Sequence, residues 1–188
     1  MTNGPPARQA WDRWAADGLI PKISATEMAR FTRHMPGHRG ATAIDAGCGA
    51  GEFSRRLHGL GYTVTGLDFS PASLDLALRA GHGPGLHYVL HDLEAGDPPG
   101  LPAGGVDVVV ARAVLAFLAR PERWLLHLRR RWLKPGGCLY LVAPTGDEHI
   151  PQRGQMTRPQ IARLRDGWDT VMRYELDDAT FLVLRAHT

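Results

Sequence analysis

A glycine-rich turn between a predicted strand and a predicted helix constrains this chain of 188 residues more than any other feature. The apolar run Thr42–Ala46 predicts a short buried strand, and residues 52–58 predict a helix. The sequence Gly-Cys-Gly-Ala-Gly fills positions 47–51 between them. Glycine lets the backbone pass close to a ligand, and the following helix N-terminus presents N–H groups and a partial positive charge. The alternative interpretation is a turn that needs glycine only for tightness.

Most of the chain alternates between predicted strands and helices. Further strands are expected at 63–67, 86–90, 106–111 and 138–142, and helices at 10–18, 24–35, 70–79, 121–133 and 157–165. Strands that alternate with helices form a parallel sheet covered on both faces. Two last strands, 171–175 and 180–185, are joined across Asp177 and Asp178, a pair that suits a tight hairpin turn.

The charge balance and the composition exclude several classes of protein. The chain has 22 basic and 19 acidic residues, a net charge of +3 that is too small to indicate a nucleic-acid partner. No apolar run approaches the ~20 residues of a membrane-spanning helix, and residues 1–6 lack the apolar core of a secretion signal. Cys48 and Cys138 show no metal-binding spacing. We therefore expect a cytoplasmic protein with reduced thiols, no metal and no membrane partner.

Asp68, at the end of the second predicted strand, indicates a ligand that contains ribose. It follows Gly47 by 21 residues, and a carboxylate there can accept hydrogen bonds from both ribose hydroxyls, with Phe69 against a base. A dinucleotide fingerprint reads G-x-G-x-x-G, but Glu52 occupies the position of the third glycine. Because Glu52 and Asp45 would repel phosphate, the pattern favours a ligand with a positive centre and no phosphates. A helix N-cap is the alternative role of Asp68.

The motifs, taken in order, resemble those of class I S-adenosylmethionine-dependent methyltransferases. The stretch Ala-Ile-Asp-Ala-Gly-Cys-Gly-Ala-Gly at 43–51 resembles the first motif of that family. Residues 67–70 and 91–93 resemble its acidic ribose and adenine motifs. Residues 106–110 and 133–137 resemble its fourth strand and the lead-in to its fifth.

The resemblance covers residues 41–143 and implies a fold. That fold is α/β, with a Rossmann-like seven-stranded sheet that is mostly parallel, an antiparallel C-terminal hairpin and helices on both faces. The resemblance also implies a single domain over 1–188. Its expected parts are an N-terminal helical lid at 1–40, a cofactor-binding core at 41–143, and an acceptor loop, helix and hairpin at 144–188.

The resemblance further implies which residues bind S-adenosylmethionine. Asp45 would lie near the methionine amine, Asp68 would hold the ribose hydroxyls and Asp92 would accept from the adenine amino group. The complete expected set is Asp45, Gly47, Cys48, Gly49, Gly51, Asp68, Phe69, Asp92, Leu93, Ala111, Arg112 and Trp11. Two members have an alternative interpretation, Arg112 as a surface ion pair and Trp11 as the core of a short helix.

Methyl transfer requires that the acceptor nucleophile and the methyl group be held collinear, at about 3 Å. A base is required only if the acceptor loses a proton. The best candidate for that base is His149, in the loop after the fifth predicted strand, because imidazole titrates near neutrality. A solvated loop histidine is the alternative.

We expect a methyltransferase that acts on an oxygen or nitrogen of a small-molecule acceptor, in the biosynthesis of a specialised metabolite. Residues 97–100, Asp-Pro-Pro-Gly, are similar to a motif of amino-methylating nucleic-acid enzymes, but they precede the fourth strand and lack its aromatic residue. The alternatives are a non-catalytic cofactor-binding or regulatory subunit, an enzyme that acts on a macromolecule, and an NAD-dependent enzyme. Trp168 and the hairpin offer an edge at which two copies could form a homodimer.

Overall fold

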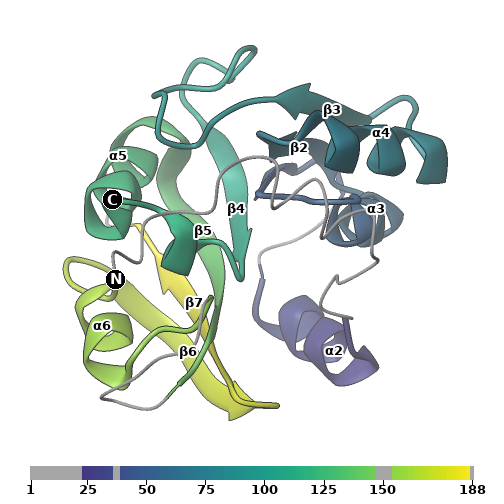
Figure 1. Ribbon diagram of the computed structural model, residues 1–188. Coiled ribbons are helices and arrows are strands. Elements are labelled where there is room, and N and C mark those ends of the chain that lie inside the picture. Colours follow the sequence, from purple (N-terminus) through teal and green to yellow (C-terminus); the bar gives the residue numbers. More distant parts are fainter. Residues whose placement is uncertain (1–22, 36–38, 147–153, 187–188) are drawn as a thin grey trace.

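The structure is a computed structural model that describes residues 23–35, 39–146 and 154–186 (Figure 1). Its helices and strands are arranged around one central sheet. The strands are β1 (Thr42–Ala46), β2 (Thr63–Asp68), β3 (Leu86–Leu90), β4 (Val106–Arg112), β5 (Leu133–Pro144), β6 (Asp169–Leu176) and β7 (Ala179–Arg185). The helices are α2 (Ala25–His34), α3 (Glu52–Gly59), α4 (Pro71–Ala80), α5 (Pro121–Arg131), α6 (Arg158–Arg163) and the 3-10 helix η1 (Leu115–Phe117).

The sheet has the strand order β3-β2-β1-β4-β5-β7-β6, and the strands from β1 to β5 are parallel. β7 lies antiparallel between β5 and β6. The chain passes outward from β1 through β2 to β3 and then returns to β4 on the other side of β1. The carboxyl ends of β1 and β4 therefore form the switch point at which open α/β sheets bind ligands. The predicted fold class is confirmed.

Helices cover both faces of the sheet. Leu128 of α5 and Ile161 of α6 belong to the core on one face, and Phe31 of α2 and Leu57 of α3 belong to the core on the other. Figure 1 shows the same division, with α5 and α6 to the left of the sheet and α2, α3 and α4 to the right. None of the helices in the described residues is both long enough and apolar enough to cross a membrane.

Aromatic packing fixes α2 to the sheet. Phe31 is fully buried, and its ring meets the rings of Phe53, Tyr62 and Tyr140 edge-on, at centroid distances of 5.4, 6.4 and 5.0 Å. Such edge-to-face pairs contribute about 0.5–1.5 kcal/mol each beyond the area that they bury. The first turn of α2 is thereby held close to Arg112, the last residue of β4.

The predicted elements that lie within the described residues are confirmed, with differences mainly at their ends. α5 ends at Arg131, and β5 begins at Leu133, so the Lys-Pro-Gly-Gly run at 134–137 lies within the strand range instead of only preceding it. A register shift between Val106 and Val108 lets β5 pair with β4 on both sides of this run. The helix expected at 10–18 lies outside the described residues.

Candidate functional site

The turn after β1 is held by the end of β2. The carbonyl of Leu67 accepts hydrogen bonds from the N–H groups of Gly47 and Cys48, at 2.8 and 2.9 Å. The Gly51 N–H donates to the Cys48 carbonyl at 2.9 Å. Gly47, Gly49 and Gly51 have positive φ values of 73°, 54° and 74°, a conformation that strains any residue with a side chain. The backbone of this turn therefore requires glycine whether or not a ligand is bound.

The space around the three glycines differs. A Cβ atom on Gly47 would lie 2.8 Å from Val114 Cγ2, and one on Gly51 would lie 2.5 Å from Tyr88 Oη. A Cβ atom on Gly49 would meet no atom of the described residues within 4 Å. Packing against the protein itself thus accounts for two of these glycines. Among the described residues, Gly49 is the one of the three whose Cβ position has no close neighbour.

Asp68 connects β2 to the glycine turn and to α4. Its Oδ2 atom accepts from the Gly49 N–H and its Oδ1 atom accepts from the Ser70 N–H, both at 2.9 Å. The residue is 8% exposed. The N-cap of α4 is Ser70, whose side chain accepts from the Ser73 N–H. The alternative role of Asp68 as N-cap is therefore wrong.

Asp45 lies beneath the turn and is almost completely buried. The Ser54 hydroxyl donates to its Oδ2 atom at 2.6 Å. Burial raises the pKa of Asp45 to about 6, and this effect outweighs the Ser54 hydrogen bond and the nearby Arg112 charge, both of which lower the pKa. Burial also raises the pKa of the Cys48 thiol, so this thiol is protonated at neutral pH.

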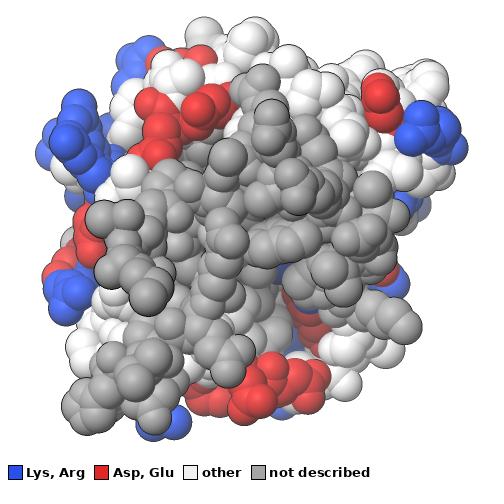
Figure 2. Space-filling view, in the orientation of Figure 1, with Lys and Arg blue, Asp and Glu red and all other residues white. Residues whose placement is uncertain are grey.

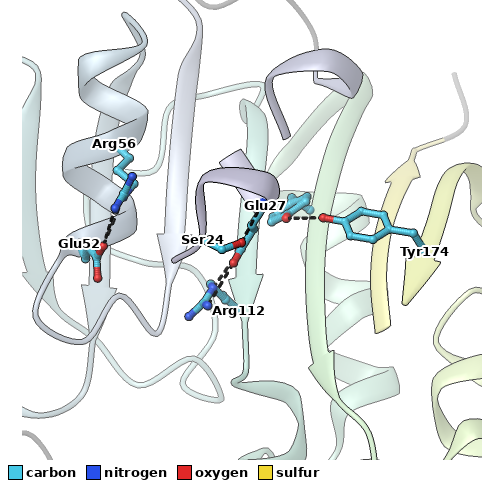
Figure 3. A network of polar contacts seen from close by, with 7 residues as sticks. Ser24, Glu27, Glu52, Arg56, Arg112 and Tyr174 are labelled. Atoms are coloured by element: carbon cyan, nitrogen blue, oxygen red, sulfur yellow. Dashed lines mark hydrogen bonds and ion pairs between the residues drawn. The ribbon is translucent and has the colours of Figure 1, made fainter. Parts of the chain in front are cut away.

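An ion pair joins α2 to the end of β4 (Figure 3). Arg112 donates from Nε to Glu27 Oε1 at 2.9 Å and from Nη2 to Glu27 Oε2 at 3.2 Å. The side chains are 15% and 3% exposed, so this is not the surface pair considered from the sequence. Ser24 caps α2 by accepting from the Glu27 N–H, while the Glu27 side chain binds Arg112. Since Glu27 precedes Phe31 by four residues, the two share a helix face, and this spacing could have revealed its burial.

The loop after β3 is tied to the start of α5. Asp92 is exposed, and its Oδ1 atom accepts from the Glu94 N–H at 3.0 Å. The Glu94 carboxylate in turn accepts from the Ala119 N–H at 3.1 Å. Leu93 is buried and Phe69 is half-buried. These contacts hold the predicted adenine-binding loop beside the start of α5.

The remaining predictions are placed as follows. Ala111 is fully buried in β4, directly before Arg112. Trp11 and His149 lie outside the described residues, in the ranges 1–22 and 147–153. The roles predicted for them therefore stay predictions. Within the described ranges, no group of three or more His, Cys, Asp or Glu side chains is arranged to hold a metal ion.

Comparison with known proteins identifies the family. Residues 44–139, about half of the chain, match the family described as methyltransferase domain. The chain belongs to the S-adenosylmethionine-dependent methyltransferase family. The matched span contains the glycine turn, Asp68 and Asp92. The family and the cofactor predicted from the sequence are thereby confirmed.

Two relatives show the range of similarity. The malonyl-[acyl-carrier protein] O-methyltransferase of Serratia marcescens is 36% identical over 104 residues, which are 54% of this chain and 38% of the relative. The ubiquinone biosynthesis O-methyltransferase of Pseudomonas paraeruginosa is 30% identical over 161 residues, which are 78% of this chain and 67% of the relative. The chain spans about half the length of the curated relatives it matches.

The fold is shared with solved methyltransferase structures. One is a methyltransferase in complex with the Haloferax volcanii Trm112 methyltransferase activator, with a TM-score of 0.78 and 22% sequence identity. The alignment covers 97% of this chain and 98% of that chain. At this identity the likeness concerns the fold alone.

The buried Glu27–Arg112 pair predicts a measurable effect on stability. Glu27→Gln leaves the largely buried guanidinium without its carboxylate, so we expect the free energy of unfolding to fall by about 2–4 kcal/mol in urea titrations. The control is Glu52→Gln, which removes the exposed Glu52–Arg56 pair and should cost about 0.5 kcal/mol or less. Equal losses in the two variants would contradict a structural role of the buried pair.

Proposed function

We propose that this chain binds S-adenosylmethionine at the carboxyl ends of β1, β2 and β4 and transfers the methyl group to an oxygen or nitrogen of a small-molecule acceptor. The observation that carries the proposal is the space that the described residues leave at Gly49, in a turn that adjoins two buried carboxylates, Asp45 and Asp68. The proposal extends the family assignment to a location and to a class of acceptor.

The charges of this site fit a cation without phosphates. Asp45 and Asp68 lie close enough that each raises the energy of charging the other, and the Arg112 guanidinium near them is already paired with Glu27. A positive ligand would relieve this repulsion, whereas a pyrophosphate would add to it. S-adenosylmethionine carries a sulfonium and an ammonium group and no phosphate. The chemistry of these side chains therefore fits this cofactor.

Each residue role in the proposal follows from chemistry. Asp45 holds the methionine ammonium, Asp68 accepts from the ribose hydroxyls, and Asp92 accepts from the adenine amino group. The bound cofactor supplies an electrophilic methyl group, so the main task of the protein is orientation. Support for Asp68 comes from its position at the end of β2, where its hydrogen bonds to Gly49 and Ser70 keep the carboxylate oriented. His149 is retained as the proposed base for an acceptor that loses a proton.

The acceptor class draws its support from the relatives. The names of two relatives indicate methyl transfer to oxygen, one in ubiquinone biosynthesis and one on a malonyl group of an acyl-carrier protein. Oxygen is therefore the first choice of acceptor atom here.

Radiolabelled S-adenosylmethionine tests the acceptor class directly. The purified chain should transfer label to a small phenolic or carboxylic acceptor from a panel that contains both. Label in an RNA or protein fraction instead would favour the macromolecular alternative. Tight cofactor binding without turnover on any acceptor would favour the non-catalytic subunit.

Comparison of Gly49→Ala with a control variant distinguishes the loss of a cofactor contact from the effect of backbone strain. The new methyl group points into the space proposed for the cofactor, so we expect S-adenosylhomocysteine to bind at least about tenfold more weakly by calorimetry. Gly40→Ala is the matched control, because Gly40 also has positive φ, 77°, and no atom of the described residues within 4 Å of its Cβ position. Both variants should lose about 1–2 kcal/mol of stability. Equal affinities in the two variants would place the cofactor elsewhere.

The raised pKa of Asp45 predicts the pH dependence of binding. Its carboxyl is mostly protonated below its pKa of about 6 and ionised above it, and only the ionised form attracts an ammonium group. The affinity for S-adenosylhomocysteine should therefore rise between about pH 5 and pH 7 and then level off. In Asp45→Asn the affinity should be lower and independent of pH in this range. An affinity that falls with rising pH in the unmodified protein would contradict the role of Asp45.

A further inference from the structure

The sheet ends at β6, and in the described part of the chain β6 pairs with β7 alone. Figure 1 shows β6 beyond β7 at the lower end of the sheet. An edge strand presents main-chain N–H and C=O groups that can pair with another strand. The main-chain groups and side chains of β6 determine which kind of strand can pair with this edge.

The hairpin turn determines which main-chain groups of β6 face outward. Asp177 and Asp178 have positive φ values of 49° and 56°, the conformation of a type I′ two-residue turn. Such a turn is closed by a doubly hydrogen-bonded pair, which here consists of Leu176 and Ala179. The register of β6 on β7 follows from this pair.

Hydrogen-bonded and non-hydrogen-bonded pairs alternate along an antiparallel ladder. Counting back from Leu176, Tyr174 bonds to β7 opposite Phe181. Arg173 and Glu175 therefore direct their N–H and C=O groups toward the open edge. A strand that joins this edge must pair with these two residues.

The side chains of β6 differ between the two faces. Met172, Tyr174 and Leu176 are half-buried and pack against the core that contains α2. Arg173 and Glu175 lie on the opposite face, 40% and 50% exposed, with Arg173 Nη2 at 3.0 Å from Glu175 Oε1. The edge thus combines an apolar face with a face that carries one positive and one negative charge.

We propose that a second copy of the chain pairs with this edge, β6 against β6, antiparallel around a two-fold axis at Tyr174. Arg173 then lies opposite Glu175 of the partner subunit, and the two residues exchange main-chain hydrogen bonds. The symmetry repeats this contact with the subunits exchanged. Each Arg173 thus lies close to Glu175 of its own strand and opposite Glu175 of the partner subunit.

Charge complementarity selects this register among those that the outward groups allow. Centring the axis on Arg173 would oppose two arginines, and centring it on Glu175 would oppose two glutamates. The register centred on Tyr174 also sets Met172 opposite Leu176 of the partner subunit on the apolar face. The register shift between Thr170 and Met172 limits the pairing to the segment beyond it.

The acidic turn favours an antiparallel arrangement. Figure 2 shows Asp and Glu side chains gathered at the lower edge of the molecule, where Figure 1 has the turn between β6 and β7. A parallel pairing would set the two acidic turns side by side, whereas the antiparallel pairing sets them at opposite ends of the shared ladder, each beside Thr170 and Val171 of the strand that begins at Asp169.

The interface would also support the helix that reaches the functional site. The Arg30 guanidinium lies 4.1 Å from the centre of the Tyr174 ring. The Tyr174 hydroxyl lies 3.5 Å from that of Tyr140, and Figure 3 marks this contact by the dashed line at Tyr174. Arg30 belongs to α2, the helix that carries Glu27. Pairing of the two β6 strands at Tyr174 would therefore hold in place a side chain that contacts α2.

Sedimentation velocity of the full chain over a range of concentrations tests the proposal. The unmodified protein should form a dimer at micromolar concentrations, and added salt should weaken it. Arg173→Glu and Glu175→Arg each turn attractive contacts into repulsive ones, so each should raise the dimer dissociation constant about tenfold or more. The double variant Arg173→Glu/Glu175→Arg restores opposite charges across the interface and should restore the dimer.

Arg79→Glu, an exposed charge reversal on α4, is the control and should leave the dimer unchanged. Circular dichroism melts establish that each variant is folded. A monomeric unmodified protein would overturn the proposal. A dimer that survives both single reversals, or a double variant that stays monomeric, would likewise overturn it by placing the interface elsewhere.

Discussion

The pairing of β1 with β2 is the constraint on which the site depends. In this register Ala46 lies beside Leu67, so the turn after β1 forms directly against the end of β2. The Leu67 carbonyl binds the first two N–H groups of the turn, and the Asp68 carboxylate binds the N–H of Gly49. The sheet thus gives the turn its shape independently of any ligand. Binding sites organised in advance lose less free energy to ordering when the ligand arrives.

The same arrangement gathers negative charge. Asp45 and Asp68 are both buried at this edge, and the Arg112 guanidinium, which offsets part of the Asp45 charge, is also paired with Glu27. Burial of a carboxylate is costly, and the raised pKa of Asp45 is the visible consequence. Such groups persist where function uses them, and binding of a cationic cofactor is the use that we propose for them.

Local patterns predicted the strands well because each carries its signal within a few residues, as in the three consecutive valines at 108–110 of β4. The glycine turn and Asp68 were found for the same reason. The Glu27–Arg112 pair was missed because its members are 85 residues apart in the chain. The sequence also did not show why glycine is needed at 47 and 51, since Val114, which follows β4, and Tyr88 of β3 reach the turn only in the folded sheet. Contacts that depend on topology cannot be seen in a local pattern.

The central claim is that these carboxylates and the open side of the turn select S-adenosylmethionine over a phosphate-containing nucleotide. Calorimetric titration of the purified chain with S-adenosylhomocysteine and, separately, with NAD tests it most directly, with Asp68→Ala alongside. The account predicts micromolar binding of S-adenosylhomocysteine, loss of that binding in the variant and no binding of NAD. Binding of NAD, or binding of S-adenosylhomocysteine that the variant leaves unchanged, would contradict it.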